Sequence, residues 1–313
     1  MTADILCLTS LPPHLQAELE DRFTVHRLFD ADDREAVLDD AGGSIRGIVT
    51  DGGKAVDEAL LERLPKLEFV TCSSAGYDRI DTAALKRRGI RMGNVSPALE
   101  DDVADTAILL LMAARRDLPR AHAHVTSGDW ADGSYPLLHS FTGGRLGIAG
   151  MGRIGAAVAR RAEGFGKEIG YFSRTEKPDA PGRHFDDLTE LAKWAGDLIV
   201  CLPGGDATRH MIGAEVMAAQ GPEGILVNVG RGSVVDEAAL IAALTDGTLG
   251  AAGLDVFHDE PTPDAALTGL PNVTCYPHHA SGTVEARGAM AQMTLDNLTA
   301  YFDGRPLPYE VSL

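Results

Sequence analysis

The chain has 313 residues, a length that suits two domains, each able to bury its own core. Hydrophobic residues make up 44% and charged residues 24%, which describes a globular protein and argues against a disordered or fibrous one. The net charge of −18 opposes phosphate backbones and anionic lipid, so nucleic acid and membrane surfaces are poor partners. A small anionic substrate would need a local cationic pocket.

The N-terminal ninety or so residues alternate short apolar runs with helix-like segments. The runs DILCLTS, TVHRLF, RGIVT and LEFVTC predict strands, and stretches such as DEALLERL between them predict amphipathic helices. This alternation is typical of an α/β domain with a parallel sheet. Pro97 and the acidic residues after it then predict the start of a long apolar helix that ends near Arg116.

A second alternating series begins at Arg145. Its six apolar runs are RLGIAG, EIGYFS, DLIVCL, GILVNV, AAGLDVF and NVTCYP. They predict another doubly wound sheet, and the pattern after Ser281 predicts one long C-terminal helix. The expected fold class is therefore α/β, with two doubly wound parallel-sheet domains, Rossmann-like or flavodoxin-like, and an active-site cleft between them.

The N-terminus and the cysteines indicate a cytoplasmic protein. MTADILCLTS lacks the basic region and long apolar core of a signal peptide, and the most apolar run, residues 107–114, is short of the ~20 residues that span a membrane. The four cysteines form no CxxC pair and sit in or just after apolar runs, which favours buried free thiols in a reducing compartment.

A glycine-rich turn follows the first strand of the second series. Gly150, Gly152 and Gly155 form G-x-G-x-x-G between an apolar strand and a helix. Gly150 permits a tight turn, Gly152 lets the backbone approach a pyrophosphate, and Gly155 lets helix and strand pack closely. An ordinary turn can produce the same pattern, but this context favours dinucleotide binding.

The end of the next strand indicates which dinucleotide binds. NAD-selective sites usually place Asp or Glu there for the ribose 2′-hydroxyl, whereas this chain has Ser173, Arg174 and Thr175. A guanidinium and two hydroxyls can bind the 2′-phosphate that a carboxylate would repel, so we expect NADPH to be preferred and NADH to be possible. The alternative is that Arg174 is a solvated surface arginine and the cofactor preference is weak.

Three ionisable residues follow three strands of this second half. Arg231, Glu260 and His278 come just past successive predicted strands, whose carboxyl ends share one edge of the sheet. Singly, each could be a solvated charge or part of a polar loop. Together, beside a dinucleotide turn, they form a candidate catalytic set. His278 and His279 also raise the question of a metal, but no third ligand lies nearby at a familiar spacing, so none is expected.

The same stretches resemble the D-isomer-specific 2-hydroxyacid dehydrogenase family, with the glyoxylate and hydroxypyruvate reductases as the most similar branch. The motifs that carry the resemblance occur in the family's order and cover nearly the whole chain: CSSAGYDRID, DDVADTAILLLMAARR, GMGRIG, NVGRGSVVDEAAL, AGLDVFHDEP and PHHASGT.

The resemblance implies a role for each member of the catalytic set. Arg231 would hold the substrate carboxylate, Glu260 would pair with His278, and His278 would donate the proton in reduction. The chemistry agrees with these roles. A nearby carboxylate favours the charged imidazolium, and arginine, which stays protonated, can bind a carboxylate but cannot be the acid. His279 departs from the family, which commonly has an aliphatic residue there.

The resemblance also implies the rest of the site and the assembly. Ser74, Ala75 and Gly76 would bind the substrate together with Arg231 and His278. The cofactor-binding residues would be Gly150, Met151, Gly152, Arg153, Ile154, Ser173, Arg174, Thr175, Pro203, Thr208, Val229 and Asp255. Residues 1–97 and 284–313 would form a discontinuous substrate-binding domain, and residues 98–283 the dinucleotide-binding domain. A homodimer would form largely through the helix that begins near Pro97. Trp130 and Tyr135 lie in a segment that reaches the neighbouring subunit's site in some relatives, but the match there is loose.

We therefore expect an NADPH-dependent reductase of small 2-oxo acids such as glyoxylate and hydroxypyruvate. One alternative is a dehydrogenase of another small acid, of the formate or phosphite type. Another is a dinucleotide-sensing binding protein like the corepressors built on this fold, which would bind NADPH without turnover. The residues of these motifs do not determine which 2-oxo acid is preferred, because a methylene changes such selectivity by only ~1–3 kcal/mol.

Overall fold

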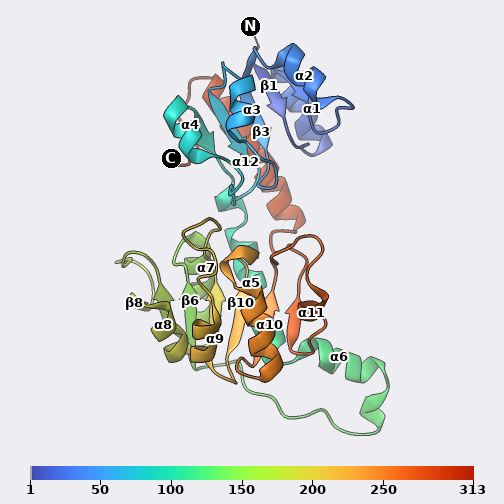
Figure 1. The fold of residues 1–313 in the computed structure, drawn as a ribbon, viewed down its shortest axis with the longest axis vertical. Helices are drawn as coiled ribbons and strands as arrows, with labels where there is room; N and C mark the ends of the chain where they lie inside the picture. Colours follow the sequence, from blue (N-terminus) through green and yellow to red (C-terminus); the bar gives the residue numbers. More distant parts are fainter. Residues whose placement is uncertain (1) are drawn as a thin grey trace. The chain divides into compact units, whose positions relative to one another are not determined.

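The computed structural model describes residues 2–313 and divides into two compact units. Among these residues, one unit comprises residues 2–99 and Gly282–Leu313, and the other comprises Glu100–Ser281. Each unit is built on one sheet whose strands are all parallel, and helices join the strands except between β7 and β8 (Figure 1). The α/β class with two parallel-sheet units, as predicted from the alternating pattern, is confirmed.

The unit that contains both termini has a five-stranded sheet in the order β2-β1-β3-β4-β5, the flavodoxin-like order. Its strands are β1 (Asp4–Cys7), β2 (Thr24–Arg27), β3 (Ile45–Thr50), β4 (Phe69–Cys72) and β5 (Arg91–Gly93). Its helices are α1 (Pro13–Arg22), α2 (Arg34–Ala41), α3 (Glu58–Arg63), α4 (Thr82–Arg88) and α12 (Val284–Phe302). The C-terminal segment thus returns to the N-terminal sheet through α12.

Alternating residues of β1 face two separate cores. Ile5 and Cys7 lie in a cluster with Leu295 of α12, whereas Leu6 lies in a second cluster with Leu85 of α4. Successive side chains of a strand point to opposite faces, so one strand can serve both clusters. The sheet is therefore covered by apolar side chains on both faces, which explains why its strands are continuous apolar runs.

The second unit has a seven-stranded sheet in the order β12-β11-β10-β9-β6-β7-β8. The strands are β6 (Arg145–Ala149), β7 (Glu168–Phe172), β8 (Arg183–Phe185), β9 (Leu198–Val200), β10 (Ile225–Asn228), β11 (Ala251–Leu254) and β12 (Val273–Cys275). The helices are α5 (Glu100–Arg115), α6 (Leu118–Thr126), α7 (Arg153–Glu163), α8 (Leu188–Ala195), α9 (Ala214–Gln220), α10 (Glu237–Asp246) and α11 (Ala265–Thr268). Helix α5 packs against α7 and against β10 and β11, while α8, α9 and α10 pack in series.

The long apolar helix begins three residues after the proline that was expected to open it. Pro97 lies in a short 3-10 helix, Ser96–Ala98, and α5 begins at Glu100 with three acidic residues in its first turn. These carboxylates suit the positive end of the helix dipole. No helix among residues 2–313 is long and apolar enough to cross a membrane.

Side-chain caps define where most of the helices begin. In each case a side-chain oxygen accepts a hydrogen bond from a backbone N–H in the first turn, which satisfies a donor that the helix leaves open. These caps are Asp33, Asp57, Asp81, Asp187, Asp236, Asp264 and Thr283. Helix α7 is an exception that bears on the site below.

Candidate active site

The glycine turn lies where the strand order of the larger sheet reverses. The chain runs from β6 outward through β7 to β8, and then returns to place β9 on the other side of β6. Gly150 directly follows β6 at this point. In open α/β sheets the crevice outside such a switch point is the usual ligand site.

Two of the three glycines are required by close backbone contacts. Gly150 has φ +105°, in the left-handed region, and a Cβ on Gly155 would lie 2.1 Å from the carbonyl oxygen of Gly150. Gly152, by contrast, is exposed, with no atom within 4 Å of the position of a Cβ. The turn is therefore tight toward the sheet and open at Gly152, as an approaching pyrophosphate requires.

Helix α7 starts from this turn with an N-terminus that no side chain caps. Gly152 is its N-cap residue and makes no side-chain capping bond. The first N–H groups of an eleven-residue helix therefore face outward, at the positive end of the helix dipole. Arg153 and Ile154 open the helix, Met151 is buried, and the donor set fits the phosphates of a dinucleotide.

The end of β7 presents the Ser-Arg-Thr segment in a loop. Arg174 and Thr175 are exposed and Ser173 is half-buried. The Ser173 hydroxyl donates to the carbonyl of Thr175 at 2.7 Å, so this loop is braced internally and the hydroxyl is not directed to solvent as a free donor. Arg174 is the cationic group that this segment offers to a ligand.

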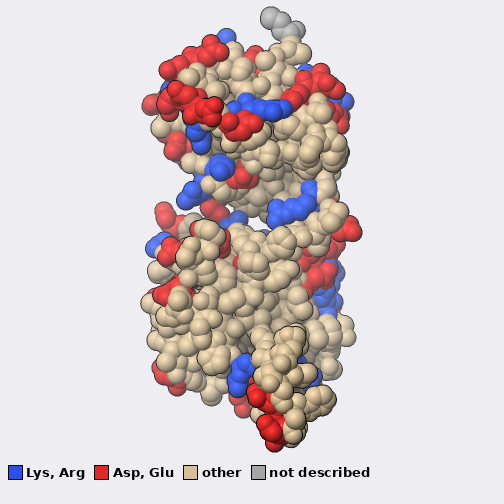
Figure 2. All heavy atoms as spheres, turned by 90° about the vertical axis from the view of Figure 1, so that its right-hand side faces the viewer, with Lys and Arg blue, Asp and Glu red and all other residues tan. Residues whose placement is uncertain are grey.

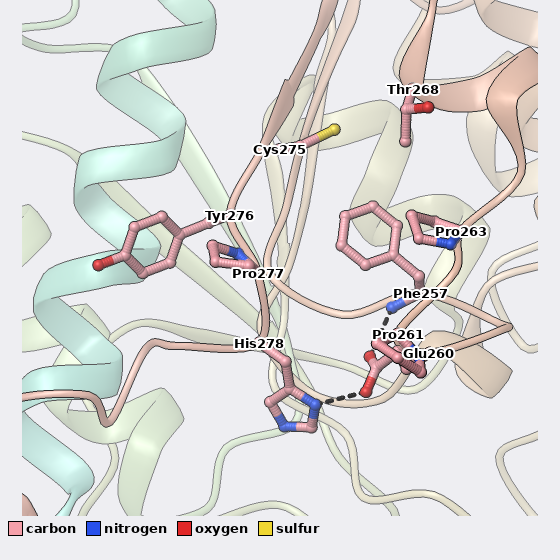
Figure 3. Close-up of a pocket in the computed structure, with 9 residues that line it drawn as sticks. All are labelled: Phe257, Glu260, Pro261, Pro263, Thr268, Cys275, Tyr276, Pro277 and His278. Carbon is pink, nitrogen blue, oxygen red and sulfur yellow. Dashed lines mark hydrogen bonds and ion pairs between the residues drawn. The ribbon is translucent and has the colours of Figure 1, made fainter.

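Glu260 and His278 form a hydrogen-bonded pair. The Nδ1 of His278 lies 2.6 Å from Oε2 of Glu260, and Oε1 of Glu260 accepts from the N–H of Phe257 at 2.9 Å (Figure 3). Both carboxylate oxygens are thus used to orient the group. With Nδ1 engaged, Nε2 of His278 is the ring nitrogen left for a reacting molecule.

The surroundings of Glu260 favour its ionised form. Partial burial by itself raises the pKa, but the hydrogen bonds from His278 and from the N–H of Phe257, with the charges of His278 and Arg231, outweigh it. The net result is a pKa of Glu260 below its ordinary value. Glu260 therefore keeps a negative charge beside the His278 ring at neutral pH.

His278 is held in an unusual backbone conformation by the strand next to it. Its φ is +49°, a region that non-glycine residues rarely adopt. The buried carboxylate of Asp255 accepts from the N–H groups of His279 at 2.8 Å and Ala280 at 3.2 Å, and the Asp255 carbonyl accepts from the N–H of His278 at 2.7 Å. Burial raises the pKa of Asp255, while the two N–H donors oppose that rise.

The Arg231 turn packs against the loop that carries Glu260. A Cβ on Gly232 would lie only 1.8 Å from the carbonyl oxygen of Phe257, so only glycine fits there. Phe257 in turn binds Glu260 through its N–H. Arg231 is close enough for its charge to lower the pKa of Glu260. The structure therefore brings Arg231, Glu260 and His278 together at one edge of the larger sheet.

A pocket of about 340 Å³ lies beside the Glu260 and His278 pair. Figure 3 shows its mostly apolar walls, formed by Phe257, Pro261, Pro263, Thr268, Cys275, Tyr276 and Pro277. Cys7 and Cys72 are buried, and burial raises the pKa of the Cys201 thiol to about 12, but Cys275 is exposed. The expectation of buried thiols was therefore wrong for Cys275, which ends the edge strand β12.

The predicted substrate loop belongs to the smaller sheet. Ser74, Ala75 and Gly76 follow the carboxyl end of β4. The Ser74 hydroxyl donates to the carbonyl of Gly76 at 2.6 Å, and the amide of Asn94 donates to the carbonyl of Ala75 at 3.2 Å. These bonds use carbonyl groups of the loop and leave its N–H groups as possible donors to an anion.

Of the remaining cofactor candidates, two lie in a loop after β9 and one follows β10. The Thr208 hydroxyl donates to the carbonyl of Pro203 at 2.7 Å, which closes the loop between them. Val229 is buried, and its N–H donates to the carbonyl of Val200 at 3.1 Å.

Within residues 2–313 no group of three or more His, Cys, Asp or Glu side chains is arranged to hold a metal ion.

One feature of the site was not predicted from the sequence. Asn228, the last residue of β10, is buried and bonds to the turn that carries Arg231. A signal was present, since this asparagine ends an otherwise apolar strand, ILVN. A buried polar residue at such a position needs partners, and its partners form the site.

A dinucleotide turn at a switch point, with a histidine and a carboxylate at the same sheet edge, defines the class of nicotinamide-dependent oxidoreductases. A family model described as D-isomer specific 2-hydroxyacid dehydrogenase, NAD binding domain, matches residues 108–280, more than half of the chain. The chain belongs to the D-isomer-specific 2-hydroxyacid dehydrogenase family.

Characterised relatives agree with this membership. The chain is 42% identical over 303 residues to a glyoxylate/hydroxypyruvate reductase of Arabidopsis thaliana, covering 97% of each chain. It is 40% identical to 2-ketogluconate reductase of Gluconobacter oxydans, again covering 97% of each. Among solved structures, the NADPH-dependent glyoxylate/hydroxypyruvate reductase of Sinorhizobium meliloti, in complex with NADP and malonate, superposes with a TM-score of 0.92 at 38% identity, covering 100% of this chain and 97% of that one.

Proposed function

We propose that this protein is an NADPH-dependent reductase that converts small 2-oxo acids, with glyoxylate and hydroxypyruvate as the first candidates, into 2-hydroxy acids. The observation that carries the proposal is the hydrogen-bonded Glu260 and His278 pair beside Arg231, at the sheet edge that holds the dinucleotide turn. The relatives named as glyoxylate/hydroxypyruvate and 2-ketogluconate reductases support the substrate class.

His278 is the proposed proton donor. Reduction of a 2-oxo acid adds a hydride to C2, which a bound nicotinamide cofactor supplies, and a proton to the carbonyl oxygen. Glu260 fixes the imidazole through Nδ1, which leaves Nε2 to donate that proton. The lowered pKa of Glu260 keeps a negative charge beside the ring.

Arg231 is the proposed anchor for the substrate carboxylate. Its guanidinium offers parallel donors to a carboxylate and can also lie against the carbonyl oxygen. Ser74, Ala75 and Gly76 are proposed to add backbone N–H groups, since their loop uses its carbonyl groups internally. We further propose that residues 1–97 with 284–313 act as the substrate-binding domain and residues 98–283 as the dinucleotide-binding domain.

The cofactor proposal rests on two features. The uncapped start of α7 and the open Gly152 suit the pyrophosphate, with Val229, Pro203, Thr208 and Asp255 around the rest of the molecule. Arg174, exposed at the end of β7, would bind the 2′-phosphate of NADPH. The solved relative from Sinorhizobium meliloti that is named as NADPH-dependent and contains NADP supports this preference.

We also propose a homodimer. Large apolar side chains lie exposed on α5, on α6 and in the segment that follows, where a monomer would leave them in water. They are Leu109, Leu118, Val125, Trp130, Leu137 and Leu138. Figure 2 shows the side of this unit from which α6 projects, and charged side chains are sparse over the middle of the unit.

The free cysteines suit the reducing cytoplasm, which is the proposed location.

The first experiment compares kcat/KM for NADPH and NADH with saturating glyoxylate or hydroxypyruvate. In Arg174→Ala we expect kcat/KM for NADPH to fall about 10- to 100-fold, because a charge-assisted phosphate contact contributes ~1.5–3 kcal/mol, while NADH is unaffected. His278→Ala should lose ~10²–10⁴-fold in kcat with either cofactor. Arg34→Ala, an exposed arginine of the other unit, is the control.

Each alternative predicts a different result. Equal use of NADPH and NADH by the wild type would agree with the reductase activity but contradict the proposed binding of the 2′-phosphate by Arg174. Tight NADPH binding without turnover of any 2-oxo acid would contradict the enzyme and favour a dinucleotide-sensing binding protein.

A further inference from the structure

Asn228 closes a ring of hydrogen bonds around the turn that carries Arg231. It is the last residue of β10 and is 1% exposed. Its Oδ1 accepts from the N–H of Gly230 at 3.0 Å, and its Nδ2 donates to the carbonyl of Arg231 at 2.9 Å. One side chain thus binds a donor and an acceptor of the same three-residue turn.

Other backbone bonds hold the two ends of this turn in place. The N–H of Val229 donates to Val200 on β9, and the N–H of Val234 donates to the carbonyl of Arg231. The carbonyl of Asn228 accepts from the N–H of Asp255 at 3.0 Å. Asp255 holds the His278 turn, so the backbones that carry Arg231 and His278 are joined through these two neighbouring residues.

We infer that Asn228 is a positioning residue, which acts on the substrate through Arg231. Its burial keeps it from the reacting molecule, and its two bonds fix the backbone from which the guanidinium extends. The inference rests on the proposed function, in which Arg231 binds the substrate carboxylate. A displacement of about 1 Å in such a group can cost ~10²-fold in rate, so the orientation of the turn is a catalytic property.

An amide suits both bonds at once. Asparagine offers one donor nitrogen and one acceptor oxygen in a fixed plane. An aspartate in its ionised form offers only acceptors and would repel the carbonyl of Arg231. When protonated, however, it offers one O–H donor and one acceptor oxygen, which restores the pattern of the amide. This difference provides a test that depends on pH.

The test measures kcat and KM for the 2-oxo acid, and Kd for NADPH, in Asn228→Ala and Asn228→Asp. In Asn228→Ala we expect kcat/KM for the 2-oxo acid to fall about 10- to 100-fold, chiefly through KM, with NADPH binding little changed. In Asn228→Asp, burial raises the pKa of the new carboxyl above the ordinary ~3.9. Its kcat/KM relative to wild type should therefore rise as the pH falls through that raised value.

Asn272→Ala is the matched control. Asn272 also uses its amide to hold backbone, donating to the carbonyls of Leu244 at 3.2 Å and Gly250 at 3.0 Å. It precedes β12, so it lies at the opposite edge of the same sheet from the turn. We expect this variant to lower the melting temperature as Asn228→Ala does and to leave kcat/KM unchanged.

Two results would overturn the inference. One is that Asn228→Ala lowers the melting temperature like Asn272→Ala and keeps wild-type kinetics. The other is that amide hydrogen exchange at Gly230 is no faster in Asn228→Ala than in wild type. A wild type that turns over no 2-oxo acid would contradict the proposed function, and the exchange measurement would then decide on its own whether Asn228 orders the turn.

Discussion

At the scale of single residues, the site is a set of charged groups whose backbones are held by buried polar side chains. Glu260 is oriented through both of its oxygens, and Asp255 and Asn228 each hold a neighbouring turn. His278 adopts a left-handed conformation, which a folded protein tolerates where the surroundings impose it. The catalytic candidates therefore depend on buried neighbours that hold their backbones in place.

The lowered pKa of Glu260 makes a prediction about stability and pH. Because its pKa in the folded protein lies below the unfolded value of 4.5, ionised Glu260 contributes stability that is fully present above that value. The contribution is lost as the pH falls through the lower, folded pKa. We expect the melting temperature of Glu260→Gln to be below that of wild type at neutral pH, and this difference to shrink on acidification.

Thermal unfolding followed across the acidic range measures this difference. Glu176→Gln, which changes an exposed glutamate of the same unit, should match the wild type at every pH. A gap between Glu260→Gln and wild type that stays constant below 4.5 would contradict the assignment.

At the scale of elements, the buried apolar strands were predictable and two short polar strands were not. The residues ILC of β1 and LIV of β9 are buried and apolar, so their composition alone indicates a strand. β5 and β8 have three residues each, contain arginine and lie at sheet edges. These residues form strands because a neighbouring strand offers unpaired backbone N–H and C=O groups. The local sequence pattern does not indicate such a neighbour.

The candidate site was likewise predictable in part. Arg231, Glu260 and His278 could be located because each follows a strand, and parallel strands place their carboxyl ends together. The roles of Asn228 and of the Asp255 carboxylate could not be predicted. They arise from hydrogen bonds between a side chain and the backbone of residues further along the chain. The free Ser173 hydroxyl that the sequence indicated is instead used within its own loop.

A buried ionic cluster lies at the amino ends of strands of the larger sheet, away from the candidate site. Asp197, before β9, pairs with Arg115 at the end of α5, and its other oxygen lies 3.8 Å from Nζ of Lys167. The three side chains are 6%, 13% and 5% exposed, and burial raises the pKa of Asp197 and lowers that of Lys167. Asp197→Ala would leave two cations buried without a counter-charge.

We expect Asp197→Ala to lower the free energy of unfolding by about 3–5 kcal/mol, as for other buried pairs that lose one partner. Urea denaturation measures the change. Asp105→Ala removes an exposed partner of Arg161 and should cost no more than ~1 kcal/mol. Equal losses in the two variants would show that burial of the Asp197 cluster contributes nothing.

At the scale of the whole molecule, the main feature is a group of exposed apolar side chains. They lie on α5, on α6 and in the segment after α6, and a monomer would leave them in water. Leu137 is 100% exposed, Trp130 65% and Leu109 51%. A stable interface would remove such surface from water at a gain of ~25 cal/mol per Å². Self-association through this surface is therefore the expected state in solution.

We expect a double variant, Leu109→Glu with Leu137→Glu, to sediment as a monomer, because two buried charges would oppose the interface. Sedimentation velocity would give twice the 33.1 kDa chain mass for wild type and the single mass for the variant. Val284→Glu changes an 87% exposed apolar residue of the other unit and should remain dimeric. A wild type of single mass would contradict the proposed dimer.

The Asp255 carboxylate binds the turn after His278 through backbone N–H groups alone. Every residue except proline supplies that donor, so the geometry of the turn places almost no demand on the side chain at position 279. This explains how a second histidine can follow His278. Position 279 is thus a site at which the chemistry beside His278 can change without disturbing His278 itself.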